Sequence, residues 1–513
     1  MIFISGPEQL LRRTGSRRKS SCKRMHFFIR KAGIRVTRPR AIPHKARLTA
    51  LHAICVQIFR HIAQKSLAIR QYACGISRQS AEKSDNAPYA QSLCGIALKP
   101  VPRAAGRRER RRSGVELEKQ IRLAGRVDSV IQKGMQEGKI TGACVGIYQN
   151  QEEYLCKAYG LADREQETPM RTDTLFRIFS MTKPVTAVAT MQLWESGKLE
   201  LSDPVSWYIP AFREKLVDVH GELVPAKREI CIQDLLNMTS GIPYPDCWSE
   251  SQKKMGAFYG EIDRRNATDH PVDTQEFARR VGEEVPLLFQ PGEKWSYGAS
   301  ADILGAVLEK AADMPLDELY RKQIFQPLGM TDTDFYVPAE KRSRLAQLYQ
   351  YHWGEDFCGL AIEPDPHLGM TDYRKKPAFF SGGAGLISTM QDYARFANLL
   401  AGKGLHRESG VRLIGENTWR YLTTPQLSDA QKTGIDWEQL KGYTYGNLLR
   451  VLEDPLVCMT NVPAGEFGWD GWTGPYFCVS PQDGTVLLYL IQVCGGSTSD
   501  IVRKLRAITF GCL

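Results

Sequence analysis

Residues 173–188 read Asp173-Thr174-Leu175-Phe176-Arg177-Ile178-Phe179-Ser180-Met181-Thr182-Lys183-Pro184-Val185-Thr186-Ala187-Val188, an apolar lead-in followed by a serine and a lysine three positions apart. Apolar side chains recur at helical spacing from Val185 to Trp194, and Gly197 follows them. This pattern predicts a helix over residues 180–196. Pro184 is tolerated because the backbone N–H groups in the first turn of a helix have no partner within that helix.

The spacing of Ser180 and Lys183 suits nucleophilic catalysis. Positions i and i+3 share a helix face, so the lysine amine can approach the serine hydroxyl. A serine needs an adjacent base, and a lysine serves when desolvation or nearby positive charge lowers its pKa. The helix N-terminus adds free N–H groups where an oxyanion develops. The alternative is a helix cap beside a surface lysine. S-x-x-K occurs five times, at Ser16, Ser20, Ser80, Ser180 and Ser251, but only Ser180 opens an apolar helix after an apolar lead-in.

This stretch closely resembles the nucleophile segment of the serine β-lactamase-like hydrolases, which include penicillin-binding proteins, class C β-lactamases and family VIII carboxylesterases. The resemblance spans roughly residues 125–495 and is closest to the family VIII carboxylesterases. It includes, in the family's order, the segments at residues 232–241, 326–330 and 382–389. It implies an α+β fold of the β-lactamase/transpeptidase type.

Periodicity along the chain gives a matching architecture. Strands are expected at both ends of the body and helices between them, with the elements at residues 116–137 (helix), 141–149 and 153–159 (strands), 232–237, 275–281, 299–312 and 390–400 (helices), 476–480 and 485–493 (strands) and 498–508 (helix). We therefore expect one antiparallel sheet formed by both ends of the body, flanked by helices, with a largely helical middle region.

The resemblance implies a catalytic tyrosine at Tyr297, which precedes the helix expected at residues 299–312. A phenol has an ordinary pKa of about 10, and a neighbouring ammonium favours its phenolate form. Tyr297 and Lys183 would then share a proton as the catalytic base. β-Lactamases and penicillin-binding proteins usually carry an asparagine two residues after this tyrosine, whereas this chain has Ala299.

The family's third element, commonly Lys-Thr-Gly in β-lactamases, corresponds to Trp469-Asp470-Gly471, which resembles the Trp-x-Gly triplet of family VIII esterases. The resemblance implies that the backbone N–H groups of Ser180 and Trp472 form the oxyanion hole. Sheet packing is the alternative role for the two tryptophans. We predict that Trp469, Asp470, Gly471 and Ala299 bind substrate, and the loss of a lysine and an asparagine favours a neutral ester over a β-lactam or peptide.

Together these residues predict a serine hydrolase that forms an acyl-enzyme at Ser180, a carboxylesterase acting on small esters or amides without a cofactor or metal. A β-lactamase or D-Ala-D-Ala carboxypeptidase is the enzymatic alternative. The chain has no G-x-S-x-G elbow, which argues against an α/β-hydrolase. It also has no H-E-x-x-H motif, so a zinc hydrolase has no support.

The net charge of +11 over 513 residues conceals two unlike parts. Residues 1–113 hold 26 Lys and Arg against 4 Asp and Glu, whereas residues 114–513 hold 42 against 53. We expect residues 114–513 to form the hydrolase domain, with no nucleic-acid partner. The basic leader is read as disordered, as a targeting segment, or as upstream sequence translated ahead of the true start, which we favour. A further alternative is a non-catalytic protein that binds nucleic acid through this leader.

Two compositional features bear on location. No apolar stretch reaches the roughly 18–20 residues that a membrane span requires. The 13 cysteines are odd in number and include no C-x-x-C pair, which indicates free thiols in a reducing compartment rather than a disulfide framework. We therefore expect a cytoplasmic protein without a membrane span, and the sequence leaves its oligomeric state open.

Overall fold

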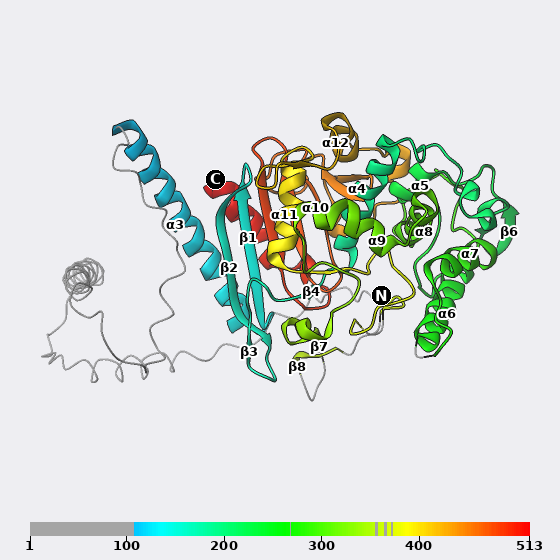
Figure 1. The fold of residues 1–513 in the computed structure, drawn as a ribbon, viewed down its shortest axis with the longest axis horizontal. Coiled ribbons are helices and arrows are strands. Elements are labelled where there is room, and N and C mark those ends of the chain that lie inside the picture. Colours follow the sequence, from blue (N-terminus) through cyan, green and yellow to red (C-terminus); the bar gives the residue numbers. More distant parts are fainter. Residues whose placement is uncertain (1–106, 267, 354–357, 364–366, 371–372) are drawn as a thin grey trace, which may run out of the picture. The chain divides into compact units, whose positions relative to one another are not determined.

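The computed structural model describes residues 107–513, apart from residues 267, 354–357, 364–366 and 371–372 (Figure 1). The expected basic leader therefore lies almost entirely outside the described residues. Helix α3 spans Arg107–Gln136 and so begins earlier than the sequence pattern predicts. None of the described helices is both long and apolar enough to cross a membrane.

An eight-stranded antiparallel sheet forms the centre of the domain, in the order β12-β13-β14-β15-β16-β1-β2-β3. Its strands come from the two ends of the domain and have the following bounds: β1 Gly142–Gln149, β2 Glu152–Asp163, β3 Thr168–Pro169, β12 Tyr443–Gly446, β13 Leu449–Leu452, β14 Phe467–Asp470, β15 Tyr476–Ser480 and β16 Thr485–Leu490. Strand β16 pairs with β1 from Cys144 opposite Leu490 to Gln149 opposite Thr485. The predicted sheet formed by both ends of the body is thus confirmed.

The β1–β2 hairpin turns where the sequence predicts it. Asn150 and Gln151 have φ angles of 52° and 65°. Two consecutive left-handed residues are the backbone of a type I′ turn, whose twist matches that of the flanking strands. The hairpin therefore turns at these two residues, with Gln149 opposite Glu152, and its register shifts between Ile147 and Tyr148.

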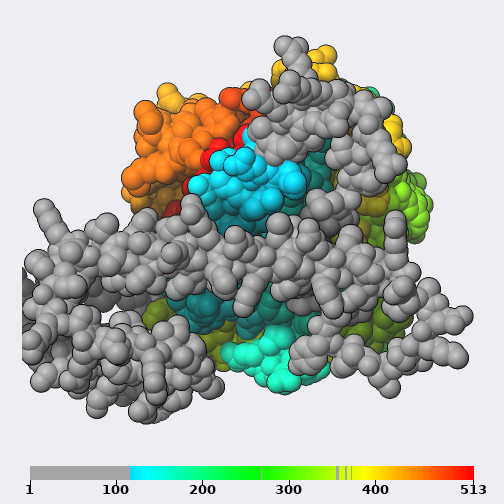
Figure 2. Space-filling model, turned by 90° about the vertical axis from the view of Figure 1, so that its left-hand side faces the viewer, coloured from blue at the N-terminus to red at the C-terminus, as the bar shows by residue number. Residues whose placement is uncertain are grey.

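Two helices cover one face of the sheet, α3 and the C-terminal helix α14 (Asp500–Cys512). They contact each other, and their buried side chains form one cluster with the sheet. Leu123, Val127 and Ile131 on α3 and Leu505 on α14 have no exposed surface. Figure 2 shows the cyan start of the domain beside its red and orange C-terminal part. The two ends of the domain thus meet in the helix layer as well as in the sheet.

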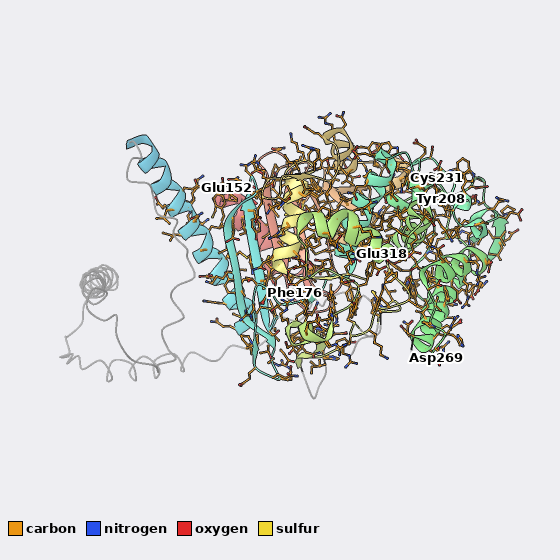
Figure 3. The ribbon with its side chains drawn as sticks, in the orientation of Figure 1. Glu152, Phe176, Tyr208, Cys231, Asp269 and Glu318 are labelled. Atoms are coloured by element: carbon orange, nitrogen blue, oxygen red, sulfur yellow. The ribbon has the colours of Figure 1, made fainter. Side chains whose placement is uncertain are left out.

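The opposite face carries α11 (Met390–Ala401), which contacts β1, β15 and β16. Helix α4 (Thr182–Glu195) contacts α8 (Ser300–Ala312) on this side of the molecule. Figure 3 shows side chains filling the space between these helices and the strands, with Phe176 labelled at the start of the segment that enters α4.

Helix α4 differs from the prediction in its surroundings. The sequence suggests one apolar face, but eleven of its fourteen residues are buried. A helix enclosed on nearly all sides is a central element rather than a surface one. Lys183 is among the enclosed residues, with no exposed surface.

The middle of the chain is largely helical, as expected. Its remaining helices are α5 Ile232–Leu236, α6 Glu250–Arg265, α7 Thr274–Glu284, α9 Leu316–Tyr320, α10 Gln326–Leu328, α12 Glu416–Thr423 and α13 Asp429–Lys432. Short two-stranded ribbons punctuate it: β4 (Phe176–Arg177) with β9 (Ile387–Ser388), β5 (Leu216–Val219) with β6 (Glu222–Pro225), β7 (Tyr349–Trp353) with β8 (Cys358–Ile362), and β10 (Leu405–His406) with β11 (Val411–Arg412). Helices α6, α9, α10, α12 and α13, strands β12 and β13 and the two-stranded ribbons are additional to the elements that the sequence pattern predicts.

The packing of α14 yields a stability prediction. Leu505→Ala should lower the free energy of unfolding by about 2–5 kcal/mol, because it leaves a cavity between the helix and the sheet. Urea denaturation measures the change. Arg503→Ala, on the exposed side of the same helix, should change stability by less than about 0.5 kcal/mol. Equal effects of the two substitutions would contradict this packing.

Candidate active site

Ser180 lies in a tight turn that leads into α4. Residues Phe179–Met181 form a single 3₁₀ turn, and Phe179 has a left-handed φ of 42°. Such a backbone is uncommon for a bulky residue and persists only where the surroundings hold it. The Ile178 N–H donates to Leu386 O at 3.0 Å, which ties the turn to the segment before β9. Ser180 is half-buried at the end of this fixed lead-in.

Lys183 occupies the position that the spacing predicts. Its Nζ lies 3.2 Å from Ser180 Oγ and 2.8 Å from Gly383 O, to which it donates. It lies equally close, at 3.2 Å, to the hydroxyl oxygen of Tyr244. Besides the serine, groups from two separate segments thus hold the amine in place.

Burial sets the protonation of Lys183. Removal from water disfavours the ammonium form and lowers the pKa of Lys183 to about 7, against the opposing effect of the carboxylates of Asp302 and Asp470. A substantial share of the amine is therefore neutral near pH 7. The alternative of a surface lysine beside a helix cap is excluded by this burial.

The segment at residues 381–383 supports the lysine from behind. Asp302, on α8, has only 1% of its surface exposed and accepts hydrogen bonds from Ser381 Oγ at 2.5 Å and from the Gly383 N–H at 3.0 Å. A Cβ atom at Gly383 would lie 2.8 Å from Asp302 Oδ2. The glycine therefore permits the close approach that aims its carbonyl at Lys183.

Tyr297 reaches the site through another close backbone approach. A Cβ atom at the following residue, Gly298, would lie 1.9 Å from Ile242 O, so only glycine fits there. The Tyr297 ring centroid lies 4.7 Å from Lys183 Nζ, and its hydroxyl accepts a hydrogen bond from Trp469 Nε1 at 3.1 Å. The structure thus brings Ser180, Lys183 and Tyr297 together.

The structure alters the expected proton arrangement. Burial raises the pKa of Tyr297 above its ordinary value, although hydrogen bonds with Ser180 and Trp469 oppose the shift. The phenol therefore keeps its proton at neutral pH, whereas the Lys183 amine titrates there. Burial thus favours the protonated phenol of Tyr297 over the expected phenolate, beside a lysine amine that titrates near neutral pH.

Tyr244 is a residue of the site that the sequence pattern does not single out. Its hydroxyl lies against Lys183 Nζ, and its ring centroid lies 5.6 Å from that of Tyr297. It follows the segment at residues 232–241 that resembles the family, which was the available signal. A second, half-buried phenol therefore lies at the amine.

The four residues expected to bind substrate divide into two groups. Trp469 and Gly471 border the reacting residues: Trp469 bonds to Tyr297, and a Cβ atom at Gly471 would lie 2.4 Å from Ile178 O. Ala299 is fully buried. The Asp470 carboxylate accepts hydrogen bonds from Arg450 and Ser497, at 3.2 and 2.8 Å, so partners within the protein occupy both of its oxygens.

Trp472 lies in the turn after β14, beside the Ser180 turn. Its indole ring contacts Phe179 at 5.4 Å between centroids and stacks on His367 at 4.0 Å. The next residue, Thr473, donates from Oγ1 to Arg177 O at 2.7 Å. These contacts hold the backbone of the 471–475 turn against the segment that precedes the serine.

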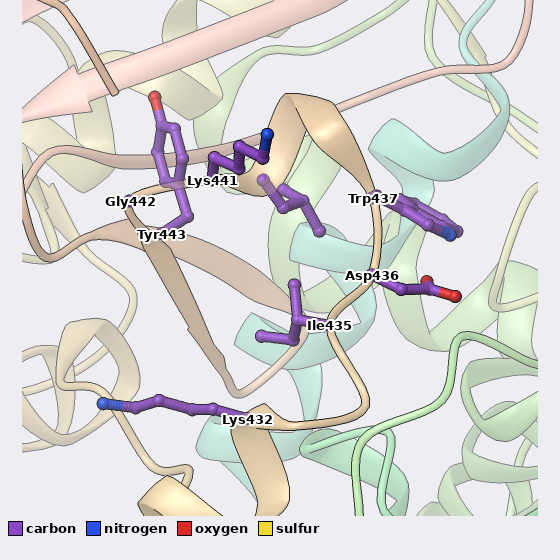
Figure 4. A pocket seen from close by; sticks show the side chains of 8 residues that line it. Lys432, Ile435, Asp436, Trp437, Lys441, Gly442 and Tyr443 are labelled. Carbon is purple, nitrogen blue, oxygen red and sulfur yellow. The ribbon is translucent and has the colours of Figure 1, made fainter. Parts of the chain in front are cut away.

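An aromatic cluster extends away from Tyr297. The Trp437 ring makes an edge contact with Tyr297 at 5.0 Å and with Trp295 at 5.5 Å. Trp437 also belongs to the wall of a surface pocket of about 300 Å³, drawn in Figure 4, which is lined by Lys432, Ile435, Asp436, Trp437, Leu440, Lys441, Gly442 and Tyr443. The reacting residues do not line this pocket. Across the described part of the chain, no group of three or more His, Cys, Asp or Glu side chains could hold a metal ion.

Comparison with known proteins places this geometry in context. The family model described as Beta-lactamase matches residues 127–508. Esterase EstB of Burkholderia gladioli is 31% identical over 399 residues, covering 75% of this chain and 94% of that protein. Protein Rv1367c of Mycobacterium tuberculosis is 33% identical over 373 residues, covering 71% and 88%. A solved structure titled "EstCE1, a hydrolase with promiscuous acyltransferase activity" superimposes with a TM-score of 0.63 at 26% identity, covering 76% of this chain and 99% of that one.

The burial of Lys183 yields a prediction that requires no substrate. The folded-state pKa lies below the unfolded value, so the unfolded chain binds more protons between about pH 7 and pH 10. The free energy of unfolding should therefore rise with pH in this window, by up to about 1.4 kcal/mol per unit. Urea denaturation of Lys183→Met should lack this contribution, whereas Lys198→Met, at an exposed position, should retain it. Parallel pH profiles for Lys183→Met and the unaltered protein would contradict the burial of a neutral amine.

Proposed function

The chain belongs to the beta-lactamase family, and on that premise we propose that it is a carboxylesterase that cleaves small neutral esters through an acyl-enzyme at Ser180. Esterase relatives identify the broader class as serine hydrolase. The observation that carries the proposal is the buried Lys183 amine, 3.2 Å from Ser180 Oγ and with a pKa of about 7. This amine is close enough to the serine hydroxyl to accept its proton, and its pKa lets it do so near neutral pH.

In the acylation step, Ser180 Oγ attacks the ester carbonyl and its proton passes to the Lys183 amine. The C–O bond to the alcohol then breaks, and the alkoxide takes up a proton. Tyr297, still protonated at neutral pH, donates that proton and is reprotonated from the lysine ammonium. The Tyr244 hydroxyl adds a dipole at the same amine. The step leaves an acyl-serine and a free alcohol.

Backbone N–H groups of Ser180 and Trp472 are proposed to hold the oxyanion. Ser180 lies in the first turn of its helix, where backbone N–H groups lack intrahelical partners. Trp472 lies beyond the last paired residue of β14, Asp470. The contacts of the 471–475 turn with Arg177 and Phe179 keep both donors fixed before substrate binds, which is what electrostatic stabilisation requires.

Deacylation repeats the chemistry with water. A water molecule attacks the acyl carbon while Lys183 takes its proton, the bond to Ser180 Oγ breaks, and the proton returns to the serine. The carboxylic acid product leaves and releases its remaining proton to the solvent, becoming a carboxylate. Lys183 thus returns to its starting state after each turnover.

The substrate class follows from the residues around the reacting groups. Trp469 stands where β-lactamases carry the lysine that binds a carboxylate, and its indole N–H is already bonded to Tyr297. Ala299 stands in place of an asparagine and is buried. Trp469, Trp472 and Trp437 form an aromatic surrounding, which suits the uncharged acyl and alkoxy groups of an ester.

The cysteines bear on the compartment in which the protein works. Cys144 and Cys478 are buried free thiols, and free thiols persist in a reducing compartment, which supports the expected cytoplasmic location.

Ser180→Ala should abolish hydrolysis of p-nitrophenyl butyrate, because it removes the nucleophile. Ser251→Ala is the matched control: it alters the other S-x-x-K serine of the domain, which lies buried in α6, and should retain activity within about twofold. Turnover by pure, folded Ser180→Ala would overturn the proposal. In the same assay, a strong preference for nitrocefin or a D-Ala-D-Ala peptide over the ester would reject the assignment of substrate.

The rate should depend on pH through Lys183. Because the amine must be neutral to accept a proton, kcat/KM should rise with pH and level off above an apparent pKa of about 7. Stopped-flow measurement between pH 5 and pH 9 tests this. Lys183→Arg should be inactive across the whole range, since a guanidinium does not deprotonate. A profile that is flat from pH 5 upward would contradict the role of the lysine.

A further inference from the structure

A chain of buried charges runs from the C-terminal helix to the strand beside the active site. Glu466, with no exposed surface, accepts hydrogen bonds from Arg506 of α14 at 3.3 Å and from the Tyr443 hydroxyl at 3.0 Å. Arg450 of β13 lies 3.9 Å from Glu466 and donates to Asp470 at 3.2 Å. Asp470 is the last residue of β14.

Arg450 connects three strands by passing over Gly468, a position of β14 that has no side chain. It stands opposite Gly468 of β14 in the sheet register, and its second guanidinium nitrogen donates to Phe477 O of β15 at 3.0 Å. A Cβ atom at Gly468 would lie 2.2 Å from that same carbonyl oxygen. The arginine thus crosses β14 over the glycine and connects its neighbours with the Asp470 carboxylate.

Burying this network is costly. Desolvation of a buried ion pair can exceed the Coulomb attraction that the pair gains, so it is weak support for stability alone. Only 4% of the Arg450 side chain is exposed, and 29% of Asp470. The network instead fixes the positions of the groups in it, because a forked guanidinium holds its hydrogen-bond acceptors in a set arrangement.

Asp470, at the end of this network, is adjacent in sequence to Trp469, which bonds to the catalytic Tyr297. Side chains alternate along a strand, so Asp470 faces Arg450 while its neighbour Trp469 faces the opposite side, where it bonds to Tyr297. Asp470 also accepts a hydrogen bond from Ser497, which precedes α14. Fixing Asp470 from two sides fixes both Trp469 before it and the turn with Trp472 after it.

We propose that Arg450 and Asp470 are positioning residues of the active site, which hold the end of β14 so that Trp469 supports Tyr297 and the Trp472 N–H stays beside Ser180. This inference rests on the proposed function. In this proposal, Asp470 binds Arg450 and Ser497 of the same chain and does not bind the substrate.

The Asp470 carboxylate also acts on Lys183 through its charge. The ionisable groups that face the lysine are Asp302 from α8, Tyr297, Tyr244 and, from β14, Asp470. Both carboxylates favour the ammonium and oppose the lowering of its pKa by burial. Removing one of these negative charges therefore lowers the pKa of Lys183 further.

Asp470→Asn separates charge from geometry. The amide can still accept from Arg450 and contact Ser497, so kcat on the plateau of the pH profile should fall less than in Asp470→Ala, which loses both contacts. The acid limb of kcat/KM should move to lower pH, by up to about one unit, because the amine loses its proton more easily. The rise in the free energy of unfolding should also begin at a correspondingly lower pH, and this second measurement needs no substrate.

Asp470→Ala and Arg450→Lys test the positioning itself. Asp470→Ala removes both contacts and should lower kcat at least tenfold with little change in KM, since the oxyanion donor shifts more than the binding surface. Arg450→Lys retains the charge but loses the fork, so an intermediate loss is expected. Unchanged kcat in Asp470→Ala would overturn the positioning role.

Glu276→Gln is the matched control, because Glu276 forms a similar pair with Arg265, at 2.6 and 3.0 Å, with a comparable exposed fraction of 27%. It should leave the pH profile and kcat unchanged. If Asp470→Asn shifts neither the kinetic acid limb nor the unfolding profile relative to this control, the inference fails while the esterase assignment stands. If instead Ser180→Ala retains turnover, the esterase assignment fails, and the unfolding profile still decides whether Asp470 acts on Lys183.

Discussion

The removal of Lys183 from water is the constraint on which the rest of the site depends. An ammonium with no exposed surface would normally be avoided, and the protein supplies one carbonyl and two hydroxyls around it instead of a contacting carboxylate. Asp302 acts one layer further out, on the turn that presents the Gly383 carbonyl. Because no carboxylate among the described residues bonds directly to the amine, the lysine can lose its proton near neutrality and still point at Ser180.

Much of this arrangement was accessible from short-range sequence patterns. The approach of Lys183 to Ser180 needs only i, i+3 spacing on a helix, and the β1–β2 hairpin follows from two short strand-like stretches around Asn150-Gln151. Helix α6 was predictable too, since Met255, Phe258, Tyr259 and Ile262 recur at helical spacing, but the sequence analysis overlooked it. The position of Tyr297 came from resemblance rather than from any local pattern.

Other features depend on packing between distant segments and leave no local signature. Tyr244 meets the amine because Gly298 lets the two loops approach. The partner of Asp470 is set by the β13–β14 register, and β13 is only four residues long. The enclosure of α4 on nearly all sides likewise follows from what surrounds it. The expectation of a Tyr297 phenolate left out burial, which the sequence does not display and which raises the pKa of that phenol.

The pairing of β16 with β1 carries a consequence for how the chain acquires its fold. Gln149 meets Thr485 only after more than three hundred intervening residues have been made, and closing so long a loop costs entropy before any contact rewards it. Such a topology has a high contact order, which slows folding. During synthesis, the β1–β2 hairpin must wait with one edge unpaired until the last strands leave the ribosome, and in that interval the edge is open to aggregation.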